Sequence, residues 1–208
     1  MVAFDSTTAA KLSAPFEPSS ENKRTYMNDL AADVVIDGNT VTLTHHPREN
    51  VTVVNVLTVM AISDTDFTAD RKATVTVDGV EEGTMEDTVQ CSKTDEDYDL
   101  EIIGTWEGRR ITGDAPFDDG KGHRFEYKAD GTYAYYVKDG DEWVPSTDVL
   151  SEYFVTSDLL CHHWTDGNEE HAEGWDLTID GDNMIWTALR KDENGEFHTM
   201  SFELERVR

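Results

Sequence analysis

The stretch Gly104-Thr105-Trp106-Glu107-Gly108 opens the half of the chain whose pattern decides the fold. In an extended strand, alternate residues share a face, so Gly104, Trp106 and Gly108 lie together. Seven further runs follow at short intervals, and the eight cover about residues 102–111, 123–128, 132–138, 149–156, 159–164, 171–179, 183–190 and 196–207. Eight successive short strands predict an antiparallel up-and-down β-barrel, a closed arrangement that leaves no free sheet edge.

The segments between alternating runs are rich in Gly, Asp and Asn along the whole chain. These residues accept the positive φ angles that tight hairpins require, so each segment predicts a turn and the chain is expected to be all-β. The segments are Asp37-Gly38-Asn39, Asp78-Gly79, Asp130-Gly131, Asp139-Gly140-Asp141, Asp166-Gly167-Asn168, Asp180-Gly181-Asp182 and Asn194-Gly195.

The region before the barrel predicts a smaller antiparallel β domain over residues 24–94, with the barrel itself over residues 99–208. Residues 1–23 contain Ser, Thr and Ala clusters with two prolines and predict a loose arm. His45-His46 precedes His162-His163 by 117 residues, and Asp78-Gly79 precedes Asn194-Gly195 by 116. This spacing leaves two interpretations: the first domain is a partial repeat of the barrel, or it is an unrelated β-sandwich.

Three motifs in the second half carry a family resemblance. They are Gly104-Thr105-Trp106-Glu107-Gly108, then Phe125-Glu126-Tyr127 with Asp130-Gly131-Thr132-Tyr133, and finally Trp186-Thr187-Ala188-Leu189-Arg190. In this series, residues 99–208 resemble the short lipocalin-like (calycin-type) domains of bacterial envelope proteins. The resemblance implies a binding or structural role without chemical activity, in the periplasm or at the outer-membrane surface. The domain is shorter than a full lipocalin and has no helical pattern after its last strand, a departure that bears on whether its interior is open.

The chain is strongly acidic. It has 17 Lys and Arg against 44 Asp and Glu, a formal net charge of −27. Such a surface repels phosphate backbones and anionic lipid, so nucleic acid is not an expected partner. No apolar run approaches the ~18 residues of a membrane span, and Met1–Asp5 has neither the basic start nor the apolar core of a signal peptide. We therefore expect a soluble protein, either an envelope protein whose leader has been removed or a cytoplasmic one, with the resemblance favouring the envelope.

The sequence predicts no metal, no cofactor and no catalytic activity. The neighbouring histidines of His45-His46 and of His162-His163 point to opposite faces of a strand, so neither pair can chelate one ion. Cys161 and His162 diverge for the same reason. No Gly-x-Ser-x-Gly, phosphate-binding loop or His-Glu-x-x-His motif is present.

Nine large aromatic residues in the barrel separate two functional hypotheses. An eight-strand barrel has room for its own side chains or for one small ligand. If space remains, we expect a small apolar molecule or a glycan to bind at the mouth, against Tyr133, Tyr135, Trp164, Trp175 and Trp186. If the aromatic residues fill the interior, the barrel is a protein–protein interaction or structural module. The nine are Trp106, Phe125, Tyr127, Tyr133, Tyr135, Trp164, Trp175, Trp186 and Phe202.

Arg206 shares a face of the last run with Phe202 and Leu204, so the alternation directs a cation toward the core. In a closed up-and-down barrel the last strand pairs with the first, which places Arg206 beside Trp106. A guanidinium within ~6 Å of the ring centroid is stabilised by the indole face. Full lipocalins close one barrel end with such an arginine over the tryptophan, so the resemblance implies the same contact. The alternative is that Arg206, third from the C-terminus, extends into solvent.

Overall fold

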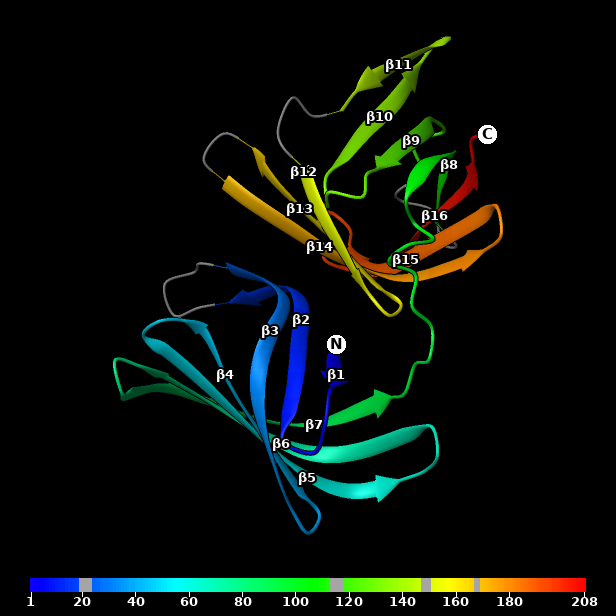
Figure 1. Cartoon of the computed structure of the whole chain (residues 1–208). Coiled ribbons are helices and arrows are strands. Elements are labelled where there is room, and N and C mark those ends of the chain that lie inside the picture. The colour runs from blue at the N-terminus through cyan, green and yellow to red at the C-terminus, as the bar shows by residue number, and fades with distance from the viewer. Residues whose placement is uncertain (19–23, 113–117, 147–150, 167–168) are drawn as a thin grey trace. The chain divides into compact units, whose positions relative to one another are not determined.

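The structure is a computed structural model that describes residues 1–18, 24–112, 118–146, 151–166 and 169–208. The described residues form β-strands and no helix, so the all-β prediction is confirmed. They divide into two compact units, Met1–Asp95 and Glu96–Arg208 (Figure 1). In this described part of the chain there is no helix that could span a membrane.

The N-terminal unit is one antiparallel sheet whose strands follow sequence order, β1 to β7. Its buried side chains form a small cluster of Ala10, Val34, Leu43, Leu57 and Ala69. The strands are β1 (Val2–Phe4), β2 (Ala9–Pro18), β3 (Arg24–Asp37), β4 (Thr40–Arg48), β5 (Val51–Ile62), β6 (Asp66–Val77) and β7 (Val80–Ser92).

The loose arm predicted over residues 1–23 is wrong for the residues described there, because they include all of β1 and β2. Ala10 and Leu12 are 2% and 8% exposed, so β2 contributes to the core. The amino group of Met1 also donates a hydrogen bond of 2.9 Å to the carbonyl of Ser13. Two buried side chains and one terminal hydrogen bond thus order a segment whose composition suggested a loop.

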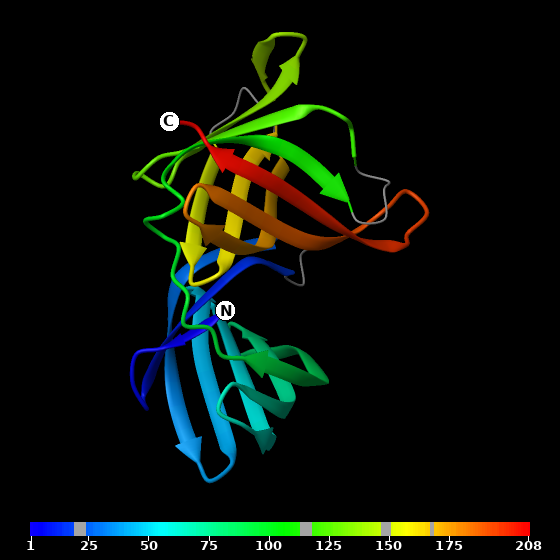
Figure 2. The same ribbon diagram turned by 90° about the vertical axis from the view of Figure 1, so that its right-hand side faces the viewer.

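The C-terminal unit is a nine-stranded antiparallel sheet in the order β11-β10-β9-β8-β16-β15-β14-β13-β12. The sheet curls into a half-barrel, with β8, β16 and β15 side by side (Figure 2). One isolated bridge joins Thr132, directly before β10, to Glu152 of the end strand β12. The strands are β8 (Gly104–Thr112), β9 (Gly122–Tyr127), β10 (Tyr133–Asp139), β11 (Glu142–Pro145), β12 (Ser151–Thr156), β13 (Leu159–Asp166), β14 (Glu169–Asp180), β15 (Asn183–Lys191) and β16 (Phe197–Arg206).

All eight predicted runs of the barrel are present, and the predicted pairing of the first strand with the last is confirmed, since Arg206 is the register partner of Trp106. The short strand β11 was not predicted. The turn glycines Gly38, Gly79, Gly131, Gly140, Gly181 and Gly195 all have positive φ, as expected of the hairpins they form. The remaining predicted turn, at residues 166–168, lies outside the described residues in its last two positions.

Both glycines of the opening motif allow close approach of β16. A Cβ on Gly108 would lie 1.9 Å from the carbonyl oxygen of Glu203, and a Cβ on Gly104 would lie 2.7 Å from Nη1 of Arg206. Gly104 also has φ +139°, which L side chains rarely adopt. The motif is therefore needed for the strand that closes the barrel to pack against the strand that opens it.

The contact predicted between Arg206 and Trp106 is present. The guanidinium carbon of Arg206 lies 4.1 Å from the centroid of the Trp106 ring. Nη1 and Nη2 of Arg206 donate hydrogen bonds of 2.8 and 2.5 Å to the carbonyls of Ile103 and Glu101. Trp106 is fully buried, and its Nε1 donates to the carbonyl of Ile102 at 2.7 Å. Arg206 thus covers one end of the barrel core instead of extending into solvent.

Candidate functional site

A partly open cavity of about 300 Å³ lies among the inward-facing side chains of the C-terminal unit. The five residues predicted to contact a ligand, Tyr133, Tyr135, Trp164, Trp175 and Trp186, all line it. Other lining residues are Arg110, Phe125, His162, Glu173, Met200 and Phe202. Strand alternation therefore gathers the predicted aromatic residues at one place.

Strand pairing explains how the wall forms. On β13 and β14, Leu160 is the register partner of Trp175, His162 of Glu173, and Trp164 of His171. These pairs follow one another at every second residue, so they share the inward face of the two strands. On the opposite part of the wall, Tyr135 of β10 pairs with Phe125 of β9, and their rings stack at 4.6 Å between centroids.

The cavity exists although most of the nine aromatic residues are buried. Six of them are buried, whereas Tyr133, Tyr135 and Trp164 are half-buried. The sequence predicts that inward-facing aromatic side chains would leave no room for a cavity, and this prediction is wrong. The buried rings pack edge to face and face to face, for example Trp175 with Trp186 at 4.7 Å and Trp186 with Phe202 at 4.4 Å. The space remains beside the half-buried rings.

A chain of polar contacts leads away from Tyr135. Its hydroxyl lies 2.8 Å from Nδ1 of His123, and Nε2 of His123 lies 3.1 Å from Oδ1 of Asp119. The other oxygen of Asp119 accepts a 2.9 Å hydrogen bond from Arg110. Burial lowers the pKa of His123 although Asp119 opposes the shift, so the ring is neutral near pH 7. With Nε2–H donated to the carboxylate, Nδ1 accepts from Tyr135, and the phenol oxygen is left as an acceptor.

His162 lies at the inner wall of the cavity. It is 3% exposed, and burial, reinforced by Arg190, lowers its pKa to about 3. Nε2 of His162 lies 2.8 Å from the hydroxyl of Tyr127, whose own pKa burial raises well above its usual value. Both groups are therefore uncharged across the physiological range, and they contribute a polar but neutral patch.

Glu173 is the one carboxylate among the described lining residues, and it is half-buried. Burial raises its pKa, with Arg190 and His171 opposing. Its nearest cationic atom, Nη2 of Arg190, is 4.0 Å from Oε2. Arg190 is held by other contacts, because it donates to the carbonyl of Gly174 at 3.0 Å and lies 4.4 Å from the ring centroid of Trp175.

Three buried N–H donors in the lining residues have no hydrogen-bond partner within the described chain. They are Nε1 of Trp175, Nε1 of Trp186 and Nε of Arg110. Buried donors left unsatisfied are costly and uncommon. All three donors belong to residues that line one cavity, so it is here that the packing of the protein leaves buried N–H groups without hydrogen-bond partners.

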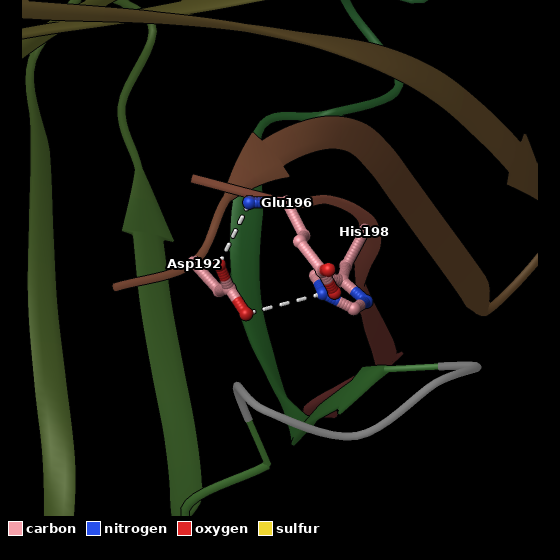
Figure 3. A group of neighbouring side chains, drawn as sticks. All are labelled: Asp192, Glu196 and His198. Atoms are coloured by element: carbon pink, nitrogen blue, oxygen red, sulfur yellow. Dashed lines mark hydrogen bonds and ion pairs between the residues drawn. The ribbon is translucent and has the colours of Figure 1, made fainter. Parts of the chain in front are cut away.

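The histidine pairs diverge as predicted. His45 is 2% exposed whereas His46 is exposed, and His162 is buried whereas His163 is half-buried. A different group, Asp192, Glu196 and His198 in the β15–β16 hairpin, brings three metal-ligand types within 4.8 Å (Figure 3). Oδ1 of Asp192 already accepts from the backbone N–H groups of Asn194 and Glu196 at 2.8 and 2.9 Å, and Oδ2 lies 3.3 Å from His198. These contacts give the group a structural role in the hairpin turn.

Sequence reasoning did not single out Glu173, Arg110 or His162 as cavity residues. In a chain with 44 acidic residues a lone carboxylate carries no signal. The position of Glu173 in the strand could have identified it, because alternation places it on the same inward face as Trp175, Leu177 and Ile179. Neither a family model nor a curated protein sequence matches this chain.

Proposed function

We propose that the C-terminal unit binds a small molecule in its aromatic cavity and catalyses no reaction, in the manner of a lipocalin-like domain. The observation that carries the proposal is the cavity of about 300 Å³, walled by seven Phe, Tyr and Trp residues and a few polar groups. This volume is at the lower end of the range of about 300–1,000 Å³ typical of ligand pockets, and the mixture of apolar and polar lining is also typical.

The chemistry of the wall supports binding without catalysis. Burial raises the pKa of Tyr135 to about 12, so its hydroxyl stays protonated and is a weak nucleophile. Neutral, buried His162 is too weak a base at its pKa of about 3 to accept a proton near pH 7. The flat faces of Trp164 and Tyr133 suit an apolar molecule or a sugar ring, which are the ligand classes expected from the sequence.

A structural or interaction module is the second candidate. Its support is the dense packing of the buried rings around Trp186, which stabilises the barrel with no ligand bound. The location at the bacterial envelope is proposed from the three motifs at residues 104–108, 125–133 and 186–190 alone.

We also propose that the N-terminal unit is a partial repeat of the barrel. Strands β4 to β7 begin at Thr40, Val51, Asp66 and Val80, and β13 to β16 begin 117 to 119 residues later. His45 of β4 and His162 of β13 are both buried. A nearly constant offset over four consecutive strands is the spacing that a duplication leaves.

Binding can be tested with a neutral apolar dye, N-phenyl-1-naphthylamine, and by native mass spectrometry of the freshly purified protein. We expect dye fluorescence to rise on binding and Trp164→Ala to weaken binding by up to about tenfold, given the roughly 0.5–1.5 kcal/mol of a stacked aromatic contact. Trp143→Ala is the matched control, because Trp143 stacks on Arg124 and Lys138 away from the cavity lining. Absence of both dye binding and a co-purified mass, or equal effects of the two variants, would overturn the proposal.

A further inference from the structure

We propose that the cavity takes a small organic cation carrying an alkylated ammonium group, with Glu173 as its counterion and the surrounding rings as its cage. This inference rests on the proposed function, because it names the class of ligand for the same cavity. It follows from how the charges in the wall are paired, from the aromatic lining and from the charge of the unit.

Glu173 is the charged group in the wall with the fewest partners. Its carboxylate has no hydrogen bond among the described residues, and its closest cation is 4.0 Å away. Glu173 shares the inward face of β14 with Trp175 and is the register partner of His162, which is uncharged near pH 7. A partly desolvated carboxylate is stabilised by a cation brought to it.

The two arginines near the cavity have other partners, and only Arg190 also approaches Glu173, with Nη2 4.0 Å from Oε2. Arg110 donates to Asp119 at 2.9 Å, which leaves its charge neutralised by a carboxylate outside the lining. Arg190 donates to the carbonyl of Gly174 and lies over the Trp175 ring. The guanidinium of Arg190 is thus already a cation bound on the face of Trp175, one of the cavity's aromatic residues. This contact shows that the rings of the wall accept a positive charge.

The rings provide the rest of the site. Phe125, Tyr133, Tyr135, Trp164, Trp175 and Trp186 line the same space as Glu173. Burial raises the pKa of both Tyr133 and Tyr135, and the negative charge of Glu173 adds a smaller shift in the same direction. Aromatic faces that surround a desolvated position favour quaternary and alkylated ammonium groups, which present apolar methyl surface together with positive charge.

The charge of the unit favours a cation over an anion. Glu96–Arg208 contains 28 Asp and Glu against 10 Lys and Arg, a net charge of −18. This field raises the local concentration of cations and repels anions that would otherwise be drawn to Arg110.

The test compares three probes of the same shape by isothermal titration calorimetry: choline, its neutral isostere 3,3-dimethylbutan-1-ol, and the anion 3,3-dimethylbutanoate. Choline and the alcohol differ in a single N⁺-to-C replacement, so their affinity ratio measures the effect of charge alone. We expect choline to bind about tenfold or more tightly than the alcohol, and the anion to bind weakest. The titration is repeated at about 1 M NaCl, because salt screens unspecific attraction to the acidic surface.

Glu173→Gln keeps the shape of the side chain and removes its charge. We expect it to abolish most of the preference for choline over the alcohol. Asp176→Asn removes one charge from an exposed, outward-facing position on the same strand and should leave the preference unchanged. Circular dichroism melts establish that both variants are folded.

Equal affinity for choline and the alcohol, or tighter binding of the anion, would overturn the organic-cation assignment while the cavity remains a binding site for neutral or anionic molecules. Equal losses in Glu173→Gln and Asp176→Asn would also overturn it, because the effect would then belong to the surface field. No binding of any of the three probes by calorimetry, together with dye binding in the cavity, rejects the cation and keeps the proposed function.

Discussion

The guanidinium carbon of Arg206 lies 4.1 Å from the centroid of the Trp106 ring, and the same side chain donates two hydrogen bonds to the carbonyls of Ile103 and Glu101. One cation therefore covers the buried indole and satisfies two backbone acceptors of the segment that enters the barrel. The residues involved are a hundred positions apart in the chain, so the contact ties the first barrel strand to the last.

Arg206→Ala should lower the free energy of unfolding of the C-terminal unit by about 1–2 kcal/mol, since a cation–π contact and two hydrogen bonds are lost. For a unit of this size the melting temperature falls by about 5–10 °C. All five tryptophans belong to this unit, so tryptophan fluorescence follows its unfolding alone. Arg208→Ala, which removes an exposed surface ion pair with Asp182, is the control and should have little effect. Equal melting temperatures of Arg206→Ala and the parent would contradict the closing role.

Gly108→Ala should prevent the C-terminal unit from folding or destabilise it severely, because the new Cβ would overlap the backbone of Glu203, which cannot move without opening the β8–β16 pair. Gly83→Ala is a matched control in an exposed strand, where the added Cβ meets nothing within 4 Å. Its expected effect is neutral to slightly stabilising, by about 0.4–1 kcal/mol. Thermal melts of the two variants by circular dichroism compare them directly, and similar melts would refute the close approach.

The stability of the C-terminal unit should decrease as the pH falls below about 6.5. The unfolded chain binds a proton at His162 near its ordinary pKa of 6.5, whereas burial lowers the folded pKa to about 3. Between these values the unfolded state binds more protons, so the free energy of unfolding falls by up to about 1.4 kcal/mol per pH unit for this group. Burial also lowers the pKa of His123, which adds to the same trend.

Urea unfolding followed by tryptophan fluorescence at several pH values between about 7 and 5 measures this slope. His162→Gln should reduce the slope, whatever it does to the absolute stability, while His163→Gln on the opposite face should leave it unchanged. A slope that is unaffected by His162→Gln would show that the proton is taken up elsewhere.

One equivalent of Zn²⁺ should not form a tight complex through either histidine pair, because only one member of each pair is buried and the other points away. Calorimetric titration with zinc measures this directly. A one-to-one complex lost on His162→Ala or on His45→Ala would contradict the prediction. A complex lost on His198→Ala would instead show that the β15–β16 hairpin can rearrange to release Asp192 from its turn contacts.

Local signals predicted the strands and turns of this protein well. The glycines at Gly131, Gly181 and Gly195 marked hairpins because only a residue that tolerates positive φ suits those positions. Alternation around Trp106 and Arg206 predicted a contact between distant segments, because the up-and-down order fixes which strands are neighbours. The strand β11 was missed, since its four residues include a proline and its alternation is too short to recognise.

The candidate site was predictable in its aromatic part only. Tyr133, Tyr135, Trp164, Trp175 and Trp186 stood out by size and by alternation. The polar groups depend on burial, which differs among side chains of one type: Glu173 and Glu170 lie three residues apart, yet only Glu173 lines the cavity. Whether large rings fill a barrel or leave a hollow depends on how they stack, and a list of residues does not contain that information.

The closing pair of strands also determines when each unit can fold during synthesis. In the N-terminal unit every strand pairs with its neighbour in sequence, so the sheet can grow strand by strand as the chain emerges. In the C-terminal unit β8 can pair at once with β9, but its other edge must wait for β16, the last strand to be made. Trp106 therefore lacks its contact with Arg206 for nearly the whole translation of the barrel, and this interval is when the nascent chain is most exposed to aggregation and has most need of a chaperone.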